Sequence, residues 1–182
     1  MTGNDERELL FVLGGARSGK SSFAQKYAET HYRSRLFLAT AQILDEEMAE
    51  RVRLHKEARG SEWNVLEEPF EIPAALHSPP NPGQVILVDC LTVWLSNILL
   101  QKGEDRVGFY EENLLKALSL RKGPVILVSN EVGLGIVPEN PLGRIFRDLA
   151  GRLNQRVASA ADHVVFMAAG IPWVLKGDPK KD

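Results

Sequence analysis

The stretch GGARSGKS, residues 14–21, has the residue types and the spacing of a loop that binds phosphate groups. It fits the pattern G-x-x-x-x-G-K-[ST], in which glycines let backbone N–H groups turn inward around phosphate oxygens. The lysine of this pattern reaches the β- and γ-phosphates, and the serine hydroxyl binds Mg²⁺. We assign Lys20 a catalytic role. The predicted nucleotide-binding residues of the loop are Gly14, Gly15, Ala16, Arg17, Ser18, Gly19, Lys20 and Ser21.

Asp89 is a further residue whose type and place suggest chemistry. It ends the apolar run VILVD, residues 85–89, which is typical of a buried strand. Open α/β sheets bind ligands at the carboxyl ends of their strands, and a carboxylate there can hold Mg²⁺ directly or through water. We therefore predict that Ser21 and Asp89 bind the metal and that Mg²⁺ is the cofactor. The alternative is a solvent-exposed aspartate that begins the next helix.

Other polar residues follow expected strands at the same edge. Asn130 and Glu131 come at the end of the apolar run 124–130, so we place them in the nucleotide site without assigning their roles. Glu67, in the expected short strand 63–69, is also assigned to this site. The alternative for Asn130 and Glu131 is a loop in which nearby glycines set the backbone geometry.

Elements of two kinds must position these residues. Apolar runs predict strands at 9–14, 35–40, 63–69, 85–89, 124–130, 163–170 and, at an edge, 172–177. Amphipathic runs predict helices at 20–31, 45–60, 91–101, 109–121 and 140–161, and the proline-rich stretch 77–83 predicts a loop. Strands that are apolar on both faces and alternate with helices indicate a mostly parallel α/β sheet covered on both sides. We expect one domain, residues 1–182.

Composition limits the class of protein. Acidic residues number 24 and basic residues 22, and this balance argues against a general nucleic-acid-binding surface. Cys90 is the one cysteine, so no intrachain disulfide can form, which fits a reducing cytoplasm. The N-terminus is a poor signal peptide, and no stretch approaches the roughly 20 apolar residues of a membrane span. We therefore predict a cytoplasmic protein without a membrane span.

His55 raises a separate question, because it stands among basic residues in RVRLHKEARG, residues 51–60. No cysteine or second histidine is near enough in the sequence to suggest a metal site. From the residues alone, the simplest interpretation is a histidine on the face of the expected helix, continuing the stripe of Met48 and Val52.

Three further segments add a resemblance that covers most of the chain. They are ATAQILDEEMAERVRLHKEARG (39–60), VDCLTVWLSN (88–97) and SNEVGLGIVPENPLGRIFRDLAGRLNQRVA (129–158). Together with GGARSGKS, their order and spacing resemble the bifunctional adenosylcobinamide kinase/adenosylcobinamide-phosphate guanylyltransferases of cobalamin biosynthesis. The resemblance implies a P-loop sheet of the RecA-like type and a homotrimer.

The resemblance also implies two reactions. The family phosphorylates adenosylcobinamide with ATP or GTP, then transfers GMP from GTP to that phosphate, giving adenosylcobinamide-GDP and pyrophosphate. The transfer passes through a guanylyl-histidine, and by motif position that histidine is His55. A neutral imidazole can attack the α-phosphorus and later leave, so one difficult transfer becomes two easier ones. The basic neighbours of His55 would disfavour the imidazolium and so favour the nucleophilic form.

Two rival functions remain open at this point. A monofunctional P-loop kinase for another small molecule would use Lys20, Ser21 and Asp89 but give His55 no chemistry. A non-catalytic nucleotide-dependent switch would transfer nothing to cobinamide. The arginines of the expected helix 140–161 also allow two interpretations, a solvated basic face or contacts with phosphate or corrinoid.

Overall fold

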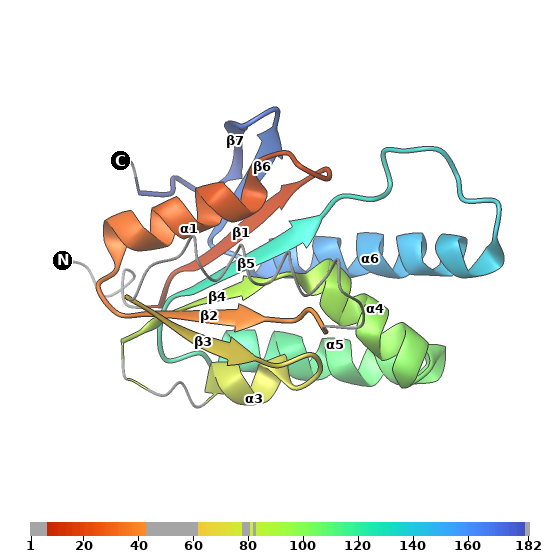
Figure 1. Cartoon of the computed structure of the whole chain (residues 1–182), viewed down its shortest axis with the longest axis horizontal. Helices are drawn as coiled ribbons and strands as arrows, with labels where there is room; N and C mark the ends of the chain where they lie inside the picture. The colour runs from red at the N-terminus through yellow and green to blue at the C-terminus, as the bar shows by residue number, and fades with distance from the viewer. Residues whose placement is uncertain (1–6, 43–61, 78–80, 82, 181–182) are drawn as a thin grey trace.

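The computed structural model describes residues 7–42, 62–77, 81 and 83–180, and one seven-stranded sheet runs through it (Figure 1). The strands are β1 (Leu9–Gly14), β2 (Arg35–Ala39), β3 (Trp63–Glu67), β4 (Val85–Asp89), β5 (Val125–Asn130), β6 (His163–Ala168) and β7 (Ile171–Lys176). The helices are α1 (Lys20–His31), α3 (Ile72–His77), α4 (Leu91–Gln101), α5 (Glu104–Ser119) and α6 (Pro141–Ala160). Within these described ranges, no helix is long and apolar enough to cross a bilayer.

The strand order brings the carboxyl ends of distant segments to one edge. The strands lie in the order β3-β2-β4-β5-β1-β6-β7. Neighbouring strands are parallel, except that β7 runs antiparallel to β6 at the outer edge. Parallel strands all end at the same side of the sheet, so β1, β2, β3, β4 and β5 present their last residues together. The mostly parallel α/β sheet and its edge strand are thus confirmed.

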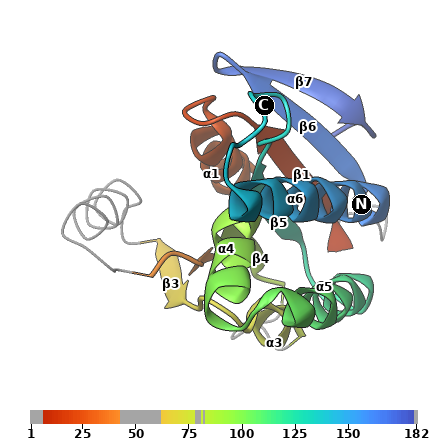
Figure 2. The same cartoon turned by 90° about the vertical axis from the view of Figure 1, so that its right-hand side faces the viewer.

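Alternate residues of β1 pack against different helices. Leu9, Phe11 and Leu13 belong to the core cluster that includes residues of α3, α4, α5 and α6. Leu10 and Val12 belong to a second cluster with residues of α1. Figure 2 shows the same division, with α1 on one side of the sheet and α4, α5 and α6 on the other. Because both faces are buried, a central strand must be apolar throughout, as its sequence is.

Two helices differ from the sequence-based expectation. The predicted helix 109–121 begins earlier in the structure, at Glu104. Glu104 and Asp105 stabilise its first turn because acidic side chains suit the positive end of the helix dipole. They are not apolar, so the apolar periodicity did not reveal this turn. The short helix α3 was not predicted. Its second residue, Pro73, lies in the first turn, where the missing N–H leaves no intrahelical hydrogen bond unmade.

The predicted loop 77–83 is wrong at His77, which ends α3. A helix of six residues is too short to show a clear periodicity in its apolar residues. The prolines that follow His77 indicated a loop, and the predicted loop therefore began one residue too early. Residues 78–80 and 82 lie outside the described residues, as does the whole of the predicted helix 45–60.

Glu8 ties three parts of the chain together at the start of β1, away from the phosphate-binding loop. The hydroxyl of Tyr27 in α1 donates to Glu8 Oε1 at 2.6 Å, and the hydroxyl of Tyr32 donates to Oε2. Lys180 Nζ and His163 Nε2 lie 3.7 and 3.4 Å from the carboxylate of Glu8. The backbone N–H of Lys180 also donates to the Tyr27 hydroxyl at 3.2 Å, which fastens the segment after β7 to α1.

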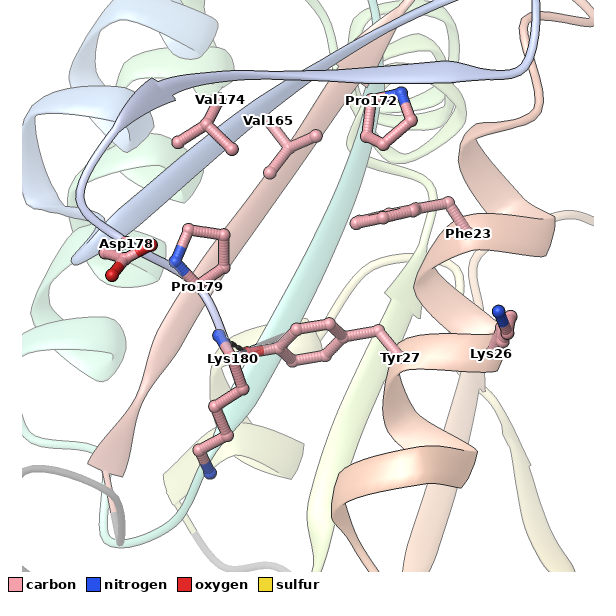
Figure 3. Close-up of a pocket in the computed structure, with 9 residues that line it drawn as sticks. All are labelled: Phe23, Lys26, Tyr27, Val165, Pro172, Val174, Asp178, Pro179 and Lys180. Atoms are coloured by element: carbon pink, nitrogen blue, oxygen red, sulfur yellow. Dashed lines mark hydrogen bonds between the residues drawn. The ribbon is translucent and has the colours of Figure 1, made fainter. Parts of the chain in front are cut away.

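Figure 3 shows a cavity of about 250 Å³ beside this fastening, between α1, β7 and the chain that follows. Phe23 and Tyr27 of α1 line it together with Pro172 and Val174 of β7 and Pro179. None of the residues predicted for the nucleotide site lines this cavity. The cavity lies next to β7, the outer strand of the sheet, and none of its lining residues belongs to the loop at the carboxyl ends of the parallel strands.

A single glycine allows the chain to leave β7 and reach Tyr27. Gly177 has φ +72, and a Cβ there would collide with His163 Nδ1 and with the carbonyl oxygen of Asp162. We expect Gly177→Ala to lower the free energy of unfolding by about 2 kcal/mol or more, because a left-handed backbone and a steric clash add. Urea denaturation measures the change. As a control, Gly108→Ala on the open face of α5 should raise stability by about 0.5–1 kcal/mol.

A Gly177→Ala variant as stable as the parent would contradict this account of the C-terminal segment.

Candidate functional site

Residues 14–21 connect β1 to α1, and the shape of this connection depends on Gly14. A Cβ at Gly14 would lie 2.5 Å from the carbonyl oxygen of Met167 and 2.6 Å from Ser18 Oγ, so a larger residue does not fit. The backbone N–H of Gly170 donates to the Ser18 carbonyl at 3.0 Å and joins the loop to the β6–β7 turn. Helix α1 has no side-chain N-cap and no acidic residue in its first turn. Its first N–H groups therefore suit an anion.

Lys20 begins α1, and its side chain folds back over the loop. The residue is only 7% exposed, and its Nζ donates a hydrogen bond of 2.6 Å to the carbonyl oxygen of Gly15. Burial lowers the pKa of Lys20 below its ordinary value, while Cys90 and Asp89 act in the opposite direction. An amine with this environment is held inside the loop, where phosphate oxygens would bind.

Although burial lowers the pKa of Lys20, Cys90 and Asp89, at the end of β4, both act to raise it. Cys90 is buried, and burial together with the charge of Asp89 raises the pKa of its thiol to about 11. The thiol therefore stays neutral near pH 7, and the carboxylate of Asp89 supplies the negative charge that stabilises the ammonium group. The end of β4 and the start of α1 are thus linked by charge.

The strand register shows which predicted residues meet at the edge. Gly14, where the loop begins, pairs with Asn130, so the start of the loop and the end of β5 lie side by side. The backbone N–H of Glu131 donates to the Gly14 carbonyl at 3.0 Å. Asp89 is on β4, the next strand beyond β5. Glu67 is farther out, because β3 is separated from β4 by β2, and it is exposed.

Asn130 and Glu131 have clear structural partners. The carbonyl of Asn130 accepts a hydrogen bond of 3.1 Å from Asn154 Nδ2 of α6. The carboxylate of Glu131 accepts one of 2.5 Å from the backbone N–H of Gly133, two residues later. These contacts shape the start of the segment that leads to α6, and they leave the assignment of both residues to the nucleotide site as a prediction.

Four buried polar residues near this edge of the sheet were not predicted from the sequence: Thr40, Thr92, Asn97 and Ser129. Thr40, after β2, bonds to Cys90, and Asn97 of α4 donates to the Thr40 carbonyl at 2.8 Å. Thr92 Oγ1 lies 3.2 Å from Ser129 Oγ and accepts from the backbone N–H of Asn130 at 2.7 Å. Their one signal in the sequence was polarity inside apolar runs, such as LTVWLSNILLQ. Buried polar groups of this kind need partners.

The donors at the edge fit Mg²⁺. The described residues contain no group of three or more His, Cys, Asp or Glu side chains that could hold a metal. Mg²⁺ characteristically keeps several waters and binds through one or two carboxylates together with substrate phosphates. A single carboxylate, Asp89, and the hydroxyl of Ser21 beside a phosphate-binding loop match that preference. Ser21 and Asp89 would hold Mg²⁺, which would neutralise the charge that develops on the phosphates of a bound nucleotide.

His55 and its basic neighbours lie outside the described residues, so its place relative to the loop stays a prediction. The arginines of α6 lie within the described residues. Arg144 Nη1 donates to the carbonyl oxygens of Pro138 and Glu139 at 3.1 and 2.6 Å, so this guanidinium braces the preceding segment. Arg147 is partly buried and lies 3.9 Å from Asp148.

Several solved structures have a similar fold, but their sequences differ widely from this one, so the similarity supports the fold alone. The flagellar accessory protein FlaH from Methanocaldococcus jannaschii has a TM-score of 0.54 at 15% identity, over 97% of this chain and 81% of FlaH. A type III secretion system ATPase has a TM-score of 0.54 at 13% identity, over 93% of this chain and 57% of the ATPase. The likeness agrees with the predicted fold, a mostly parallel α/β sheet with helices on both faces.

Sequence relatives are much closer. The bifunctional adenosylcobalamin biosynthesis protein CobP of Pseudomonas aeruginosa is 45% identical over 168 residues, which cover 92% of this chain and 97% of CobP. CobU of Escherichia coli, which carries the same description, is 38% identical over 181 residues, covering 92% and 99%. The family model described as cobinamide kinase / cobinamide phosphate guanyltransferase matches residues 10–175, nearly the whole chain, and this protein belongs to that family.

Proposed function

We propose that this protein phosphorylates adenosylcobinamide with ATP or GTP and then transfers GMP from GTP to the new phosphate, giving adenosylcobinamide-GDP and pyrophosphate. One observation carries the proposal. Lys20 is buried, with its ammonium group bonded inside the loop between β1 and α1, in a chain that is 45% identical over 168 residues to a bifunctional adenosylcobalamin biosynthesis protein. The reaction would take place in the cytoplasm, without nucleic acid.

In the kinase step, the residues of the loop act mainly by position and charge. The first N–H groups of α1 and the ammonium of Lys20 stabilise negative charge as the γ-phosphoryl group moves to the hydroxyl of the acceptor. Ser21 and Asp89 would hold Mg²⁺ at the same phosphates. Asn130 and Glu131 border the loop on its β5 side and complete the proposed nucleotide site, with Glu67 at its outer margin.

In the guanylyl transfer, His55 is the proposed nucleophile. Its neutral imidazole attacks the α-phosphorus of GTP, the bond to pyrophosphate breaks, and GMP remains on the ring nitrogen. The phosphate of the acceptor then takes the GMP and the imidazole leaves. This role rests on family membership and on the position of His55 in the motif that begins at Ala39.

Exposed apolar side chains support the proposed homotrimer. Leu134 and Ile136, before α6, are 81% and 96% exposed, and Ile171 and Trp173 of β7 are 68% and 66% exposed. Two segments, one before α6 and one in β7, thus present apolar groups to solvent. A homotrimer would cover at least part of them.

The first prediction concerns the kinase. Lys20→Ala should lower the rate of adenosylcobinamide phosphorylation by about 100-fold or more, because it removes a charge aimed at the transferring group. Product formation from adenosylcobinamide, ATP and GTP measures it by chromatography. Lys26→Ala removes an exposed lysine from the same helix and should leave the rate unchanged. If Lys20→Ala had the same kinase rate as the parent, the catalytic role assigned to Lys20 and its loop would be wrong.

The second prediction concerns the metal. Asp89→Asn should raise the Mg²⁺ concentration for half-maximal kinase rate by about tenfold or more, because an amide binds Mg²⁺ more weakly than a carboxylate. Titration with Mg²⁺ at saturating ATP gives the value. Asp148→Asn, an exposed carboxylate on α6, is the matched control. Unchanged metal dependence in Asp89→Asn would restrict Asp89 to a structural role.

The third prediction separates the bifunctional enzyme from a monofunctional kinase. With GTP and no acceptor, the parent protein should gain one GMP by mass spectrometry, and His55→Ala should gain none while it keeps measurable kinase turnover. His77→Ala, an exposed histidine at the end of α3, should behave as the parent. Guanylyl transfer should also fall in acid with a midpoint at or below about 6.5, as the imidazole protonates. An adduct that persists in His55→Ala would exclude this nucleophile.

A further inference from the structure

Thr40 follows β2 directly and is completely buried, although it is polar. Its hydroxyl accepts a hydrogen bond of 2.8 Å from the backbone N–H of Cys90 and donates one of 2.9 Å to the Cys90 carbonyl. The backbone N–H of Thr40 donates to the carbonyl of Asp89 at 3.2 Å. One residue thus holds the chain on the carboxyl side of Asp89 at three points.

Asn97 extends this hold to two further segments. Its Nδ2 donates to the Thr40 carbonyl at 2.8 Å and to the Pro69 carbonyl at 3.2 Å. Asn97 is on α4, which begins directly after Cys90, and Pro69 follows β3. The side chain therefore joins the end of β2, the exit of β3 and the helix that leads away from Asp89. It is 8% exposed, so the two bonds are shielded from water.

The held segment matters because its charge acts on Lys20. Asp89 pairs with Val128 of β5, and Gly14, where the loop of Lys20 begins, pairs with Asn130 of the same strand, so the held segment and the loop share one edge of the sheet. Neither Thr40 nor Asn97 carries a charge, and Thr40 has no exposed surface with which to contact a substrate. The hydroxyl of Thr40 bonds to the backbone of Cys90, so we expect it to act on the reaction through the position of the Asp89 segment.

We propose that Thr40 and Asn97 are positioning residues of the phosphoryl-transfer site, which fix the carboxylate of Asp89 relative to Lys20 and to the metal that serves the nucleotide. The inference rests on the proposed role of Asp89. It goes further and assigns the exact position of the Asp89 carboxylate to hydrogen bonds from Thr40 and Asn97, which are 0% and 8% exposed. Loss of the Thr40 hydroxyl should move Asp89 and weaken metal-assisted nucleotide binding, even in a folded protein.

The experiment measures binding of fluorescent ADP at increasing Mg²⁺, a readout that needs no cobinamide. Thr40→Val keeps the shape of the side chain and removes the hydroxyl. It should raise the Mg²⁺ concentration for half-maximal enhancement of binding by about tenfold, the scale typical of residues that orient a metal ligand. Nucleotide binding without Mg²⁺ should stay as in the parent. Thr40→Ser restores the hydroxyl and should return the Mg²⁺ midpoint close to the parent value.

A double-mutant cycle tests whether Thr40 acts through Asp89. In an Asp89→Asn background, Thr40→Val should cause little additional change, because the carboxylate it positions is already absent. Val107→Ala in α5 removes buried methyl groups from the core away from the loop and is the control for loss of stability. It should lower the melting temperature and leave the Mg²⁺ midpoint unchanged.

The outcomes are distinct. An unchanged Mg²⁺ midpoint in folded Thr40→Val, an equal shift in Val107→Ala, or additive effects with Asp89→Asn would each overturn the proposal. If Thr40→Val does not fold, Asn97→Ala, which leaves the Thr40 hydroxyl in place, decides by the same titration. A parent protein that binds Mg²⁺-ADP but does not phosphorylate adenosylcobinamide would refute the proposed function and leave this test intact.

Discussion

The ammonium group of Lys20 is buried in a loop made largely of backbone, and the arrangement of the central strands follows from how this charge is stabilised. Burying an unpaired charge is strongly unfavourable, so the group needs partners that are already in place. The Gly15 carbonyl accepts its hydrogen bond at 2.6 Å, and Asp89 supplies an opposite charge. These partners come from separate parts of the chain, and the parallel sheet, in which β5 lies between β1 and β4, brings them to the same edge.

That sheet could largely be predicted from the sequence because both of its faces are buried. In β1, even and odd residues enter different cores, so the strand reads as an uninterrupted apolar run. The same holds for VILVD in β4 and VILVS in β5. Short or polar elements gave weaker signals, since α3 has six residues and the first turn of α5 is acidic. Their formation depends on packing and helix electrostatics rather than on periodicity.

Some residues of the site could also be predicted from the sequence, and others could not. The loop, Asp89 and Asn130 could be placed together from chain order alone, because parallel strands end at one edge. The support beneath them could not, because Thr40 and Cys90 are 50 residues apart and their hydrogen bonds depend on which strands become neighbours. His55 marks another limit. Its residue type and surroundings favoured a surface histidine, and its proposed chemistry depends on membership of the family.

The two edges at which the strands begin and end show two different solutions for buried polar groups. At the start of β1, Glu8 contacts two tyrosines, a histidine and a lysine through side chains, and these contacts fasten α1 and the C-terminal segment. At the edge where β2 and β4 end, Thr40 and Asn97 bond mainly to backbone atoms. Bonds to backbone fix the path of the chain around the residue that carries the charge. A reaction that depends on charge placement needs this second arrangement, because a small displacement of a charged group weakens its stabilisation of the transition state.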